Sequence, residues 1–148
     1  MRIVLQRVKQ ASVTVSGETV GSIGPGYLLL LCAMKGDTEV QADWLAEKVS
    51  GLRLFDSPEG KINDRSILEV GGEILVVSQF TLSGDVSKGR RPDYTAAAGP
   101  GEGERLYKYF IQKLQTLGIR KVENGRFGAM MDVTLTNDGP VTLLLERS

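Results

Sequence analysis

The sequence of 148 residues contains no histidine and only one cysteine, Cys32. Without histidine there is no Ser-His or Cys-His nucleophile pair, and the side chain that most often acts as acid or base near neutral pH is missing. The usual zinc sites built from His and Cys are excluded as well. Any catalysis must therefore use hydroxyls, backbone groups, carboxylates or functional groups of the substrate itself.

A single cysteine also excludes a disulfide within the chain. Because Cys32 lies inside the apolar run Leu28–Cys32, we expect a buried thiol in a reducing compartment. No apolar run approaches the roughly 20 residues that span a bilayer. Met1-Arg2 leads directly into an alternating pattern rather than into a signal peptide. The sequence therefore predicts a cytoplasmic protein with no membrane contact.

The chain has no excess of either charge, with 18 Lys and Arg against 18 Asp and Glu. A neutral protein is not a general polyanion binder, so any affinity for nucleic acid must come from local patches. Lys88, Arg90 and Arg91 form the clearest patch. Runs of this length are usually solvated loops, and contact with phosphates is the functional alternative. No Asp/Glu spacing indicates a metal site, and no cofactor is expected.

Length and patterning predict one domain over residues 1–148, of mixed α/β class with strands predominating. Alternating or continuous apolar runs predict the strands Ile3–Leu5, Ala11–Val15, Thr19–Ile23, Tyr27–Ala33, Glu73–Phe80, Ile119–Glu123, Met131–Thr136 and Val141–Glu146. The run Tyr27–Ala33 has no polar face, which is typical of a strand buried on both sides.

Two helices are predicted. Thr38 and Gln41 form a capping box that begins the first, whose apolar stripe comprises Trp44, Leu45, Val49 and Leu52. The second spans Glu104–Leu117, with a stripe of Leu106, Tyr109, Phe110, Leu114 and Leu117. Between the sheet and this helix we expect a long loop over residues 83–103, with one helical turn near Tyr94–Ala98.

The segment Ser78-Gln79-Phe80-Thr81 ends the most apolar predicted strand with two hydroxyls, an amide and an aromatic ring. The simpler interpretation is a capped strand end with Phe80 in the core, and the alternative is the floor of a binding pocket. Thr81 is an unconvincing nucleophile because a threonine hydroxyl needs an adjacent base, and no histidine is available.

The segment Asn137–Thr142 contains the turn-forming run Asn-Asp-Gly-Pro. From the residues alone, Gly139-Pro140 is interpreted as a plain turn between two strands. Arg7, near the start of the chain, is interpreted equally well as a solvated charge on a strand or as a functional group. Phe127 is expected to pack in the core.

Four segments carry a family resemblance when they are taken together. They are Met1–Val8, Ser78–Leu82, Gly125–Met130 and Asn137–Thr142, in order along the whole chain. In this arrangement the sequence resembles the D-aminoacyl-tRNA deacylase family. The resemblance implies an α/β fold with a single three-layer domain, in which two β-sheets are barrel-like and helices pack on one side. It also implies a hydrolase for the ester bond of D-aminoacyl-tRNA and of glycyl-tRNA.

The resemblance implies that Ser78, Gln79, Phe80 and Thr81 line a pocket for the 3′-terminal adenosine and its amino acid. Phe80 would contact the sugar or base, Gln79 would bond the ester region, and backbone N–H groups near Phe80 and Thr81 would stabilise the oxyanion. Because a free 2′-hydroxyl lies beside the ester, we expect substrate-assisted attack by water, with Thr81 only orienting groups.

The resemblance further implies that Gly139 and Pro140 are joined by a cis bond and act as a chirality filter. Their carbonyl groups would hold the substrate's amino group and exclude an L side chain, while glycine passes. In a homodimer, this loop would be inserted into the partner's active site. Arg7 would hold the loop through its carbonyls, and Asn137 belongs to the same substrate-binding set.

Met130 and Met131 are expected as soft walls beside the amino-acid side chain. Lys88, Arg90 and Arg91 are the expected tRNA contacts, although the family's Arg-Pro-Ser-Phe is here Arg91-Pro92-Asp93-Tyr94. That difference leaves the exact contacts with tRNA open. Two other functions stay open: a non-catalytic dimeric RNA-binding module on the same fold, and a small-molecule esterase that uses Thr81.

Overall fold

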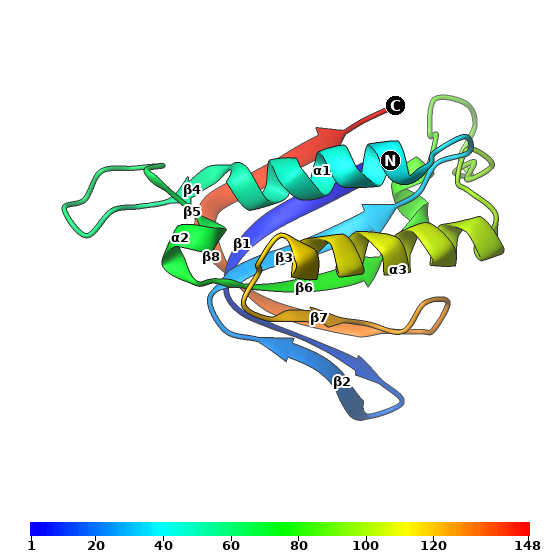
Figure 1. Cartoon of the computed structure of the whole chain (residues 1–148). Coiled ribbons are helices and arrows are strands. Elements are labelled where there is room, and N and C mark those ends of the chain that lie inside the picture. The colour runs from blue at the N-terminus through cyan, green and yellow to red at the C-terminus, as the bar shows by residue number, and fades with distance from the viewer.

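The computed structural model describes residues 1–148 and contains a six-stranded sheet, a two-stranded sheet and three α-helices (Figure 1). In chain order the elements are β1 (Arg2–Val15), β2 (Glu18–Ile23), β3 (Gly26–Cys32), α1 (Glu39–Gly51), β4 (Arg53–Phe55), β5 (Arg65–Ser66), α2 (Ile67–Val70), β6 (Glu73–Ser78), the 3₁₀ turn η1 (Phe80–Ser83), α3 (Pro100–Thr116), β7 (Val122–Asn124) and β8 (Asp132–Glu146). No helix combines the length and the apolar character needed to cross a membrane.

The long strand β1 organises the larger sheet. Its first half, Arg2–Val8, pairs antiparallel with β3, and its second half, Ala11–Val15, pairs with β2. Strand β8 runs along the other edge of β1 for nearly its whole length. The sheet curls so that β2 approaches β6 and β7, which leaves it nearly closed. The predicted fold class, a barrel-like arrangement of two sheets with helices on one side, is confirmed.

The sheet has an apolar core on each face. Tyr27, Leu29 and Leu31 of β3 face the helices, where α1 and α3 lie side by side (Figure 1). Leu28, between them, belongs to the second core, inside the curled part of the sheet. Strand β6 alternates in the same way, with Ile74 and Val76 on the helix side and Leu75 and Val77 on the other. The prediction of a strand buried on both faces is therefore confirmed for β3.

Helix α1 begins at the predicted capping box, in which Thr38 and Gln41 bond each other's backbone N–H groups. Its buried stripe comprises Ala42, Leu45, Ala46 and Val49. The prediction that Trp44 belongs to this stripe is wrong, since its side chain is 37% exposed. One residue turns a helix by about 100°, so Trp44 shares the neighbouring face with Lys48.

Helix α3 begins at Pro100, four residues before the predicted start, because proline is well suited to the first helical turn. Tyr107 is buried in place of the predicted Tyr109, whose hydroxyl instead donates to Asp43 Oδ1 at 2.8 Å. The helical turn predicted near Tyr94–Ala98 is a single hydrogen-bonded turn, with Ala97 N–H donating to the Tyr94 carbonyl.

Several strands differ from the predictions, and the strand expected at Ile119–Glu123 is the shorter β7, Val122–Asn124. Strand β6 ends at Ser78, and Phe80 lies in η1 rather than in the strand. The two strands expected at the N-terminus are one, β1, and the two expected at the C-terminus are one, β8. The interpretation of Gly139-Pro140 as a turn between strands is therefore wrong. Pairing with β1 on both sides of this dipeptide keeps β8 continuous despite its turn-forming residues.

Candidate active site

A cavity of about 490 Å³ lies where β3 and β6 end. These strands are parallel, with Leu31 opposite Ser78, so their carboxyl ends meet at one edge of the sheet. The structure brings six of the predicted site residues to this cavity: Ser78, Gln79, Phe80, Thr81, Met130 and Met131. Residues far apart in the chain thus form one pocket, and the interpretation of Phe80 as a core residue is wrong because it is 60% exposed.

Hydrogen bonds fix the shape of the Ser78–Thr81 segment. The Gln79 N–H donates to the Leu31 carbonyl at 2.8 Å, which ties the segment to the end of β3. Its side-chain amide donates to the Thr81 hydroxyl, and this is the only side-chain partner of Thr81. A side-chain amide is not basic enough to take the proton of a hydroxyl, so the structure provides no general base beside Thr81.

Cys32 lies in the cavity wall, and the prediction of a buried thiol is confirmed. Its Sγ lies 3.4 Å from the Phe80 carbonyl, which also accepts a hydrogen bond from Ser83 Oγ at 2.8 Å. Burial raises the pKa of the Cys32 thiol above its usual value. The thiol therefore stays protonated near neutral pH, and it supports η1 rather than acting as a nucleophile.

Two aromatic residues of the cavity wall were not predicted as site residues. Tyr107 donates from its hydroxyl to the Val76 carbonyl at 2.9 Å, and burial raises the pKa of its phenol to about 12. Phe127 lies beside it, with ring centroids 5.8 Å apart, and it was expected only in the core. In α3, Tyr107 lies on the buried face with Leu106 and Phe110, and a helical pattern in the sequence can reveal that burial. The pattern does not reveal that the Tyr107 side chain also borders a cavity.

The Gly139-Pro140 dipeptide forms a second cluster, around Arg7. The peptide bond between Gly139 and Pro140 is cis, and both residues are exposed. Arg7 is not a solvated charge: its Nε donates to the Asp138 carbonyl at 3.1 Å and its Nη1 donates to the Leu54 carbonyl. Asn137 accepts a hydrogen bond from Gln6 Nε2 at 3.2 Å.

The two clusters lie at opposite ends of the sheet in one chain. Arg7 pairs with Tyr27, at the start of β3, whereas Ser78 lies opposite Leu31, at its end. Three strand spacings of about 4.8 Å and four residues of about 3.3 Å separate Gly139 from Ser78, which gives a distance on the order of 20 Å. Neither Gly139 nor Pro140 lines the cavity. A single chain therefore does not bring the two motifs together.

The third predicted group, Lys88, Arg90 and Arg91, lies on an exposed loop, and none of the three is paired with a carboxylate. A two-residue bridge between Asp85 and Asp93 closes the loop. The Tyr94 ring then contacts the Phe80 ring edge-on, with centroids 5.4 Å apart. The loop is thereby attached to the mouth of the cavity.

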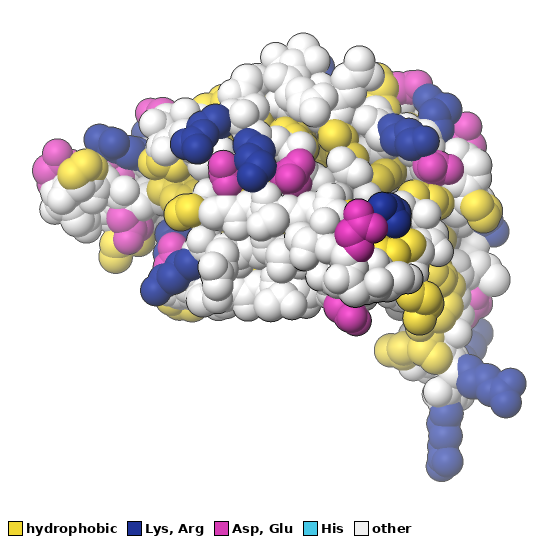
Figure 2. All heavy atoms as spheres, turned by 90° about the horizontal axis from the view of Figure 1, so that it is seen from below, with side chains coloured by type: hydrophobic (Ala, Val, Ile, Leu, Met, Phe, Trp, Pro, Cys, Tyr) yellow, Lys and Arg dark blue, Asp and Glu magenta, His cyan; other side chains and the backbone are white.

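Acidic and basic side chains are interspersed on the lower face of the molecule. Figure 2 shows them mixed on the face seen from below, in keeping with the zero net charge. No three metal-binding side chains of Cys, Asp or Glu converge at one place. The site is thus an apolar-walled cavity with amide, hydroxyl and backbone groups at its floor.

A barrel-like sheet covered by helices on one side, with a cavity at the ends of β3 and β6, places the chain in the three-layer α/β class. A family model described as "D-Tyr-tRNA(Tyr) deacylase" matches residues 4–146, and the chain belongs to this family. The resemblance found in the sequence is thereby confirmed.

Curated relatives and solved structures agree with this assignment. A protein of Symbiobacterium thermophilum named D-aminoacyl-tRNA deacylase is 56% identical, over 99% of this chain and 95% of the relative. Another of that name, from an Exiguobacterium species, is 57% identical over 100% and 99% of the two chains.

Two solved structures share the fold. One described as "c-Myc DNA Unwinding Element Binding Protein" is 40% identical, with a TM-score of 0.95 over 100% of this chain and 99% of its own. The other is described as a probable eukaryotic D-amino acid tRNA deacylase. It is 22% identical, with a TM-score of 0.77 over 97% of each chain, and this similarity shows the fold alone.

Proposed function

We propose that this protein hydrolyses the ester that joins a D-amino acid, or glycine, to the 3′-terminal adenosine of tRNA. Membership of the deacylase family supports the reaction class. The observation that carries the proposal is the cavity, which gathers Ser78, Gln79, Phe80 and Thr81 with no carboxylate, histidine or lysine in its lining. An aminoacyl ester suits such a site because it brings its own neighbouring hydroxyl. The proposed substrate implies action in the cytoplasm.

The cavity offers a partner for each part of the substrate. The exposed Phe80 ring is a platform for the terminal base or sugar, and the Gln79 amide is within reach of the ester region. The N–H groups of Phe80 and Thr81 open η1, so the turn itself provides no acceptor for them. Aimed at the cavity, such N–H groups stabilise the oxyanion that forms when the ester carbonyl is attacked.

Water is the proposed nucleophile. The ribose 2′-hydroxyl positions a water molecule, which adds to the ester carbonyl carbon. The 2′-hydroxyl relays the proton: its oxygen accepts one from the water while its own hydrogen moves toward the 3′-oxygen. The resulting oxyanion is held by backbone N–H groups near Phe80. It collapses with cleavage of the bond to the 3′-oxygen, which takes a proton from the 2′-hydroxyl. Free amino acid and tRNA are released, and Thr81 only orients Gln79.

We propose that the chirality filter is supplied by a second copy of the chain. Gly139 and Pro140 are exposed and about 20 Å from the cavity of their own chain, which supports their use in a partner's site. Strand β8 has β1 as its only neighbour, so its other edge is free for an interface. Met130, at the cavity, is 92% exposed in one chain, which also supports a covering partner.

In this proposal, carbonyl groups beside Gly139 accept the substrate's amino group, while the flat Gly-Pro backbone leaves no room for an L side chain. Arg7 supports the dipeptide through the neighbouring Asp138 carbonyl. Glycine has no side chain to exclude, so glycyl-tRNA is accepted as well. Because the filter reads only the α-carbon, many D side chains fit.

Replacing a side chain of the pocket wall is expected to alter D-amino-acid preference without creating activity on L-amino acids. Met130→Ala removes a flexible wall, so the order of preference among D-Tyr, D-Phe and D-Ala esters should change by a few fold. L-Tyr-tRNA should stay resistant because backbone atoms perform the exclusion. Hydrolysis rates on matched D and L substrates measure both effects, and rapid L-Tyr-tRNA cleavage by Met130→Ala would contradict the backbone filter.

Few phosphate contacts are expected to hold tRNA, because the net charge is zero. Alanine at Lys88, Arg90 and Arg91 should flatten the plot of log affinity against log salt by roughly 0.7–0.9 for each phosphate that is no longer neutralised. Lys121→Ala is the control, because this exposed lysine lies just before β7, beside the start of β6 and away from the cavity. An unchanged slope in the triple variant excludes this loop from the tRNA-binding surface.

Parallel deacylation of D-Tyr-tRNA, L-Tyr-tRNA and Gly-tRNA tests the proposed function. We expect the D and glycyl esters to be cleaved and the L ester to persist. An RNA-binding module would bind all three without cleaving any. A small-molecule esterase would instead cleave simple aryl esters in a reaction that Thr81→Ala abolishes. The assay therefore separates the proposal from both alternatives.

A further inference from the structure

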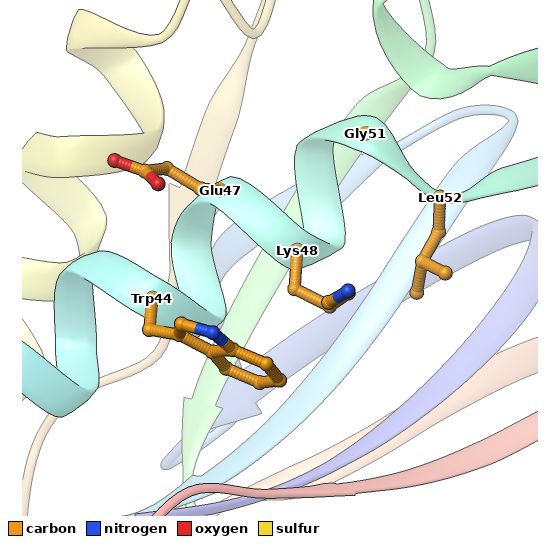
Figure 3. Close-up of a pocket in the computed structure, with 5 residues that line it drawn as sticks. All are labelled: Trp44, Glu47, Lys48, Gly51 and Leu52. Atoms are coloured by element: carbon orange, nitrogen blue, oxygen red, sulfur yellow. The ribbon is translucent and has the colours of Figure 1, made fainter.

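A groove of about 350 Å³ lies on α1, away from the proposed active site. Its lining is Trp44, Glu47, Lys48, Gly51 and Leu52, and we call it the Trp44 groove. Figure 3 shows the Trp44 ring and the Lys48 amine on the same side of α1. Glu47 points to the other side, where Lys113 of α3 lies 3.8 Å from its carboxylate.

Two cations meet at the Trp44 ring. Lys48 Nζ lies 5.1 Å from the ring centroid, and the Arg147 guanidinium carbon, just beyond β8, lies 5.0 Å from it. Neither cation has a carboxylate partner, although eight of the 18 Lys and Arg residues do. The indole orients both charges without neutralising them, because a cation–π contact leaves the charge in place. The groove thus presents two pre-ordered cations, and its one carboxylate, Glu47, is directed toward Lys113 instead.

Further unpaired cations lie near the cavity mouth, at the other end of α1. The carboxylates of α1 between the two places are paired with cations of α3: Glu39 with Arg105, and Asp43 and Glu47 with Lys113. Lys35 follows β3 and its N–H donates to the Ala96 carbonyl, in the same loop that carries Lys88, Arg90 and Arg91. Helix α1 then runs from Thr38 to Lys48, a distance of about 15 Å at 1.5 Å per residue. A rigid polyanion that leaves the cavity mouth can therefore contact both the loop with Lys88, Arg90 and Arg91 and the Trp44 groove.

We propose that the Trp44 groove binds the phosphate backbone of the double-stranded RNA stem that adjoins the substrate's single-stranded 3′ end. The inference rests on the proposed function and adds a partner surface to it. A second copy of the chain is a poorer occupant, because a stable interface needs about 800 Å² per partner with an apolar centre. The groove offers only Trp44 and Leu52 as large apolar residues, flanked by two free cations.

Trp44 is the only tryptophan, so its fluorescence reports directly on the groove. The probe is an RNA minihelix without an amino acid, which is a short duplex with a single-stranded 3′ end. Its titration should change the Trp44 emission saturably, and added salt should reverse the change. A single-stranded trinucleotide with the same 3′ end should bind the cavity without this signal. A change that depends on protein concentration alone would instead indicate a second copy in the groove and overturn the proposal.

Charge reversal at Lys48 tests the contact against a matched control. Lys48→Glu should weaken minihelix binding by about tenfold or more and flatten the salt slope by about 0.9, whereas Lys121→Glu should leave both unchanged. Arg147→Ala should resemble Lys48→Glu more weakly. Equal minihelix affinities for Lys48→Glu, Lys121→Glu and the unaltered protein would overturn the inference.

Activity on a short substrate distinguishes this inference from the proposed function. Hydrolysis of a D-aminoacyl trinucleotide, which lacks the stem, should be unaffected by Lys48→Glu, while the KM for full-length D-aminoacyl-tRNA rises and kcat stays the same. If the unaltered protein cleaves neither substrate, the proposed function is wrong, and the fluorescence titration still decides whether the groove binds duplex RNA.

Discussion

A substrate whose terminal adenosine lacks the 2′-hydroxyl should be hydrolysed about 10²–10⁴-fold more slowly than the normal ester, the usual loss when a positioned proton-transfer group is removed. The protein has no histidine, and Thr81 is bonded only to the Gln79 amide. The cavity thiol and phenol stay protonated near neutral pH because burial raises the pKa of both Cys32 and Tyr107. The substrate is therefore the remaining source of the proton-transfer group.

Thr81→Ala should have a much smaller effect, about tenfold at most, because it removes one hydrogen bond worth roughly 1 kcal/mol. Thr81→Ser is the matched control and should retain the bond to Gln79. Single-turnover rates on the normal and 2′-deoxy esters measure both changes. A covalent acyl group on Thr81, detected by mass spectrometry, would show that the side chain is the nucleophile and would contradict this mechanism.

Mixing two inactive variants should restore activity if the active site is shared between subunits. Phe80→Ala removes the exposed platform of the cavity, and Gly139→Val places a side chain on the proposed filter. A heterodimer of the two has one site with both defects and one with neither. Random exchange of equal amounts should therefore return about one quarter of the normal activity, as two-fold symmetry requires.

The controls for this experiment are each variant alone and the two mixed without subunit exchange, all of which should be inactive. Sedimentation should give a mass of about 32 kDa, twice the 16.1 kDa of one chain. A fully active monomer, or no recovery in mixtures that demonstrably exchange, would contradict the shared site.

Local patterns in the sequence predicted the elements that local physics determines. The capping box at Thr38 and the doubly buried strand β3 were found because a hydrogen-bonding pair and a continuous apolar run are visible within a few residues. Trp44 was misplaced because a large apolar ring resembles core, whereas small Ala42 and Ala46 fill the buried stripe. Its position on the outer face became clear only from the packing of α1.

Long-range pairing explains what the sequence did not predict. Asn137–Pro140 has turn-forming chemistry, yet β1 pairs with β8 on both sides of it and shifts register there. The motif thus lies in an irregular part of a continuous strand rather than between two strands. The cavity was also hidden, since it joins Ser78–Thr81 with Met130 and Met131, which are distant in the chain. From the sequence, only the family resemblance indicated that these segments form one pocket.

A crystal structure with a non-hydrolysable D-aminoacyl-adenosine analogue is the most direct test of the shared active site. The account predicts the adenosine against Phe80 in the cavity, with the amino group bonded to a main-chain carbonyl beside Gly139 of the partner subunit. An analogue bound in the cavity with the Gly139-Pro140 dipeptides of both subunits remote from it would contradict the account.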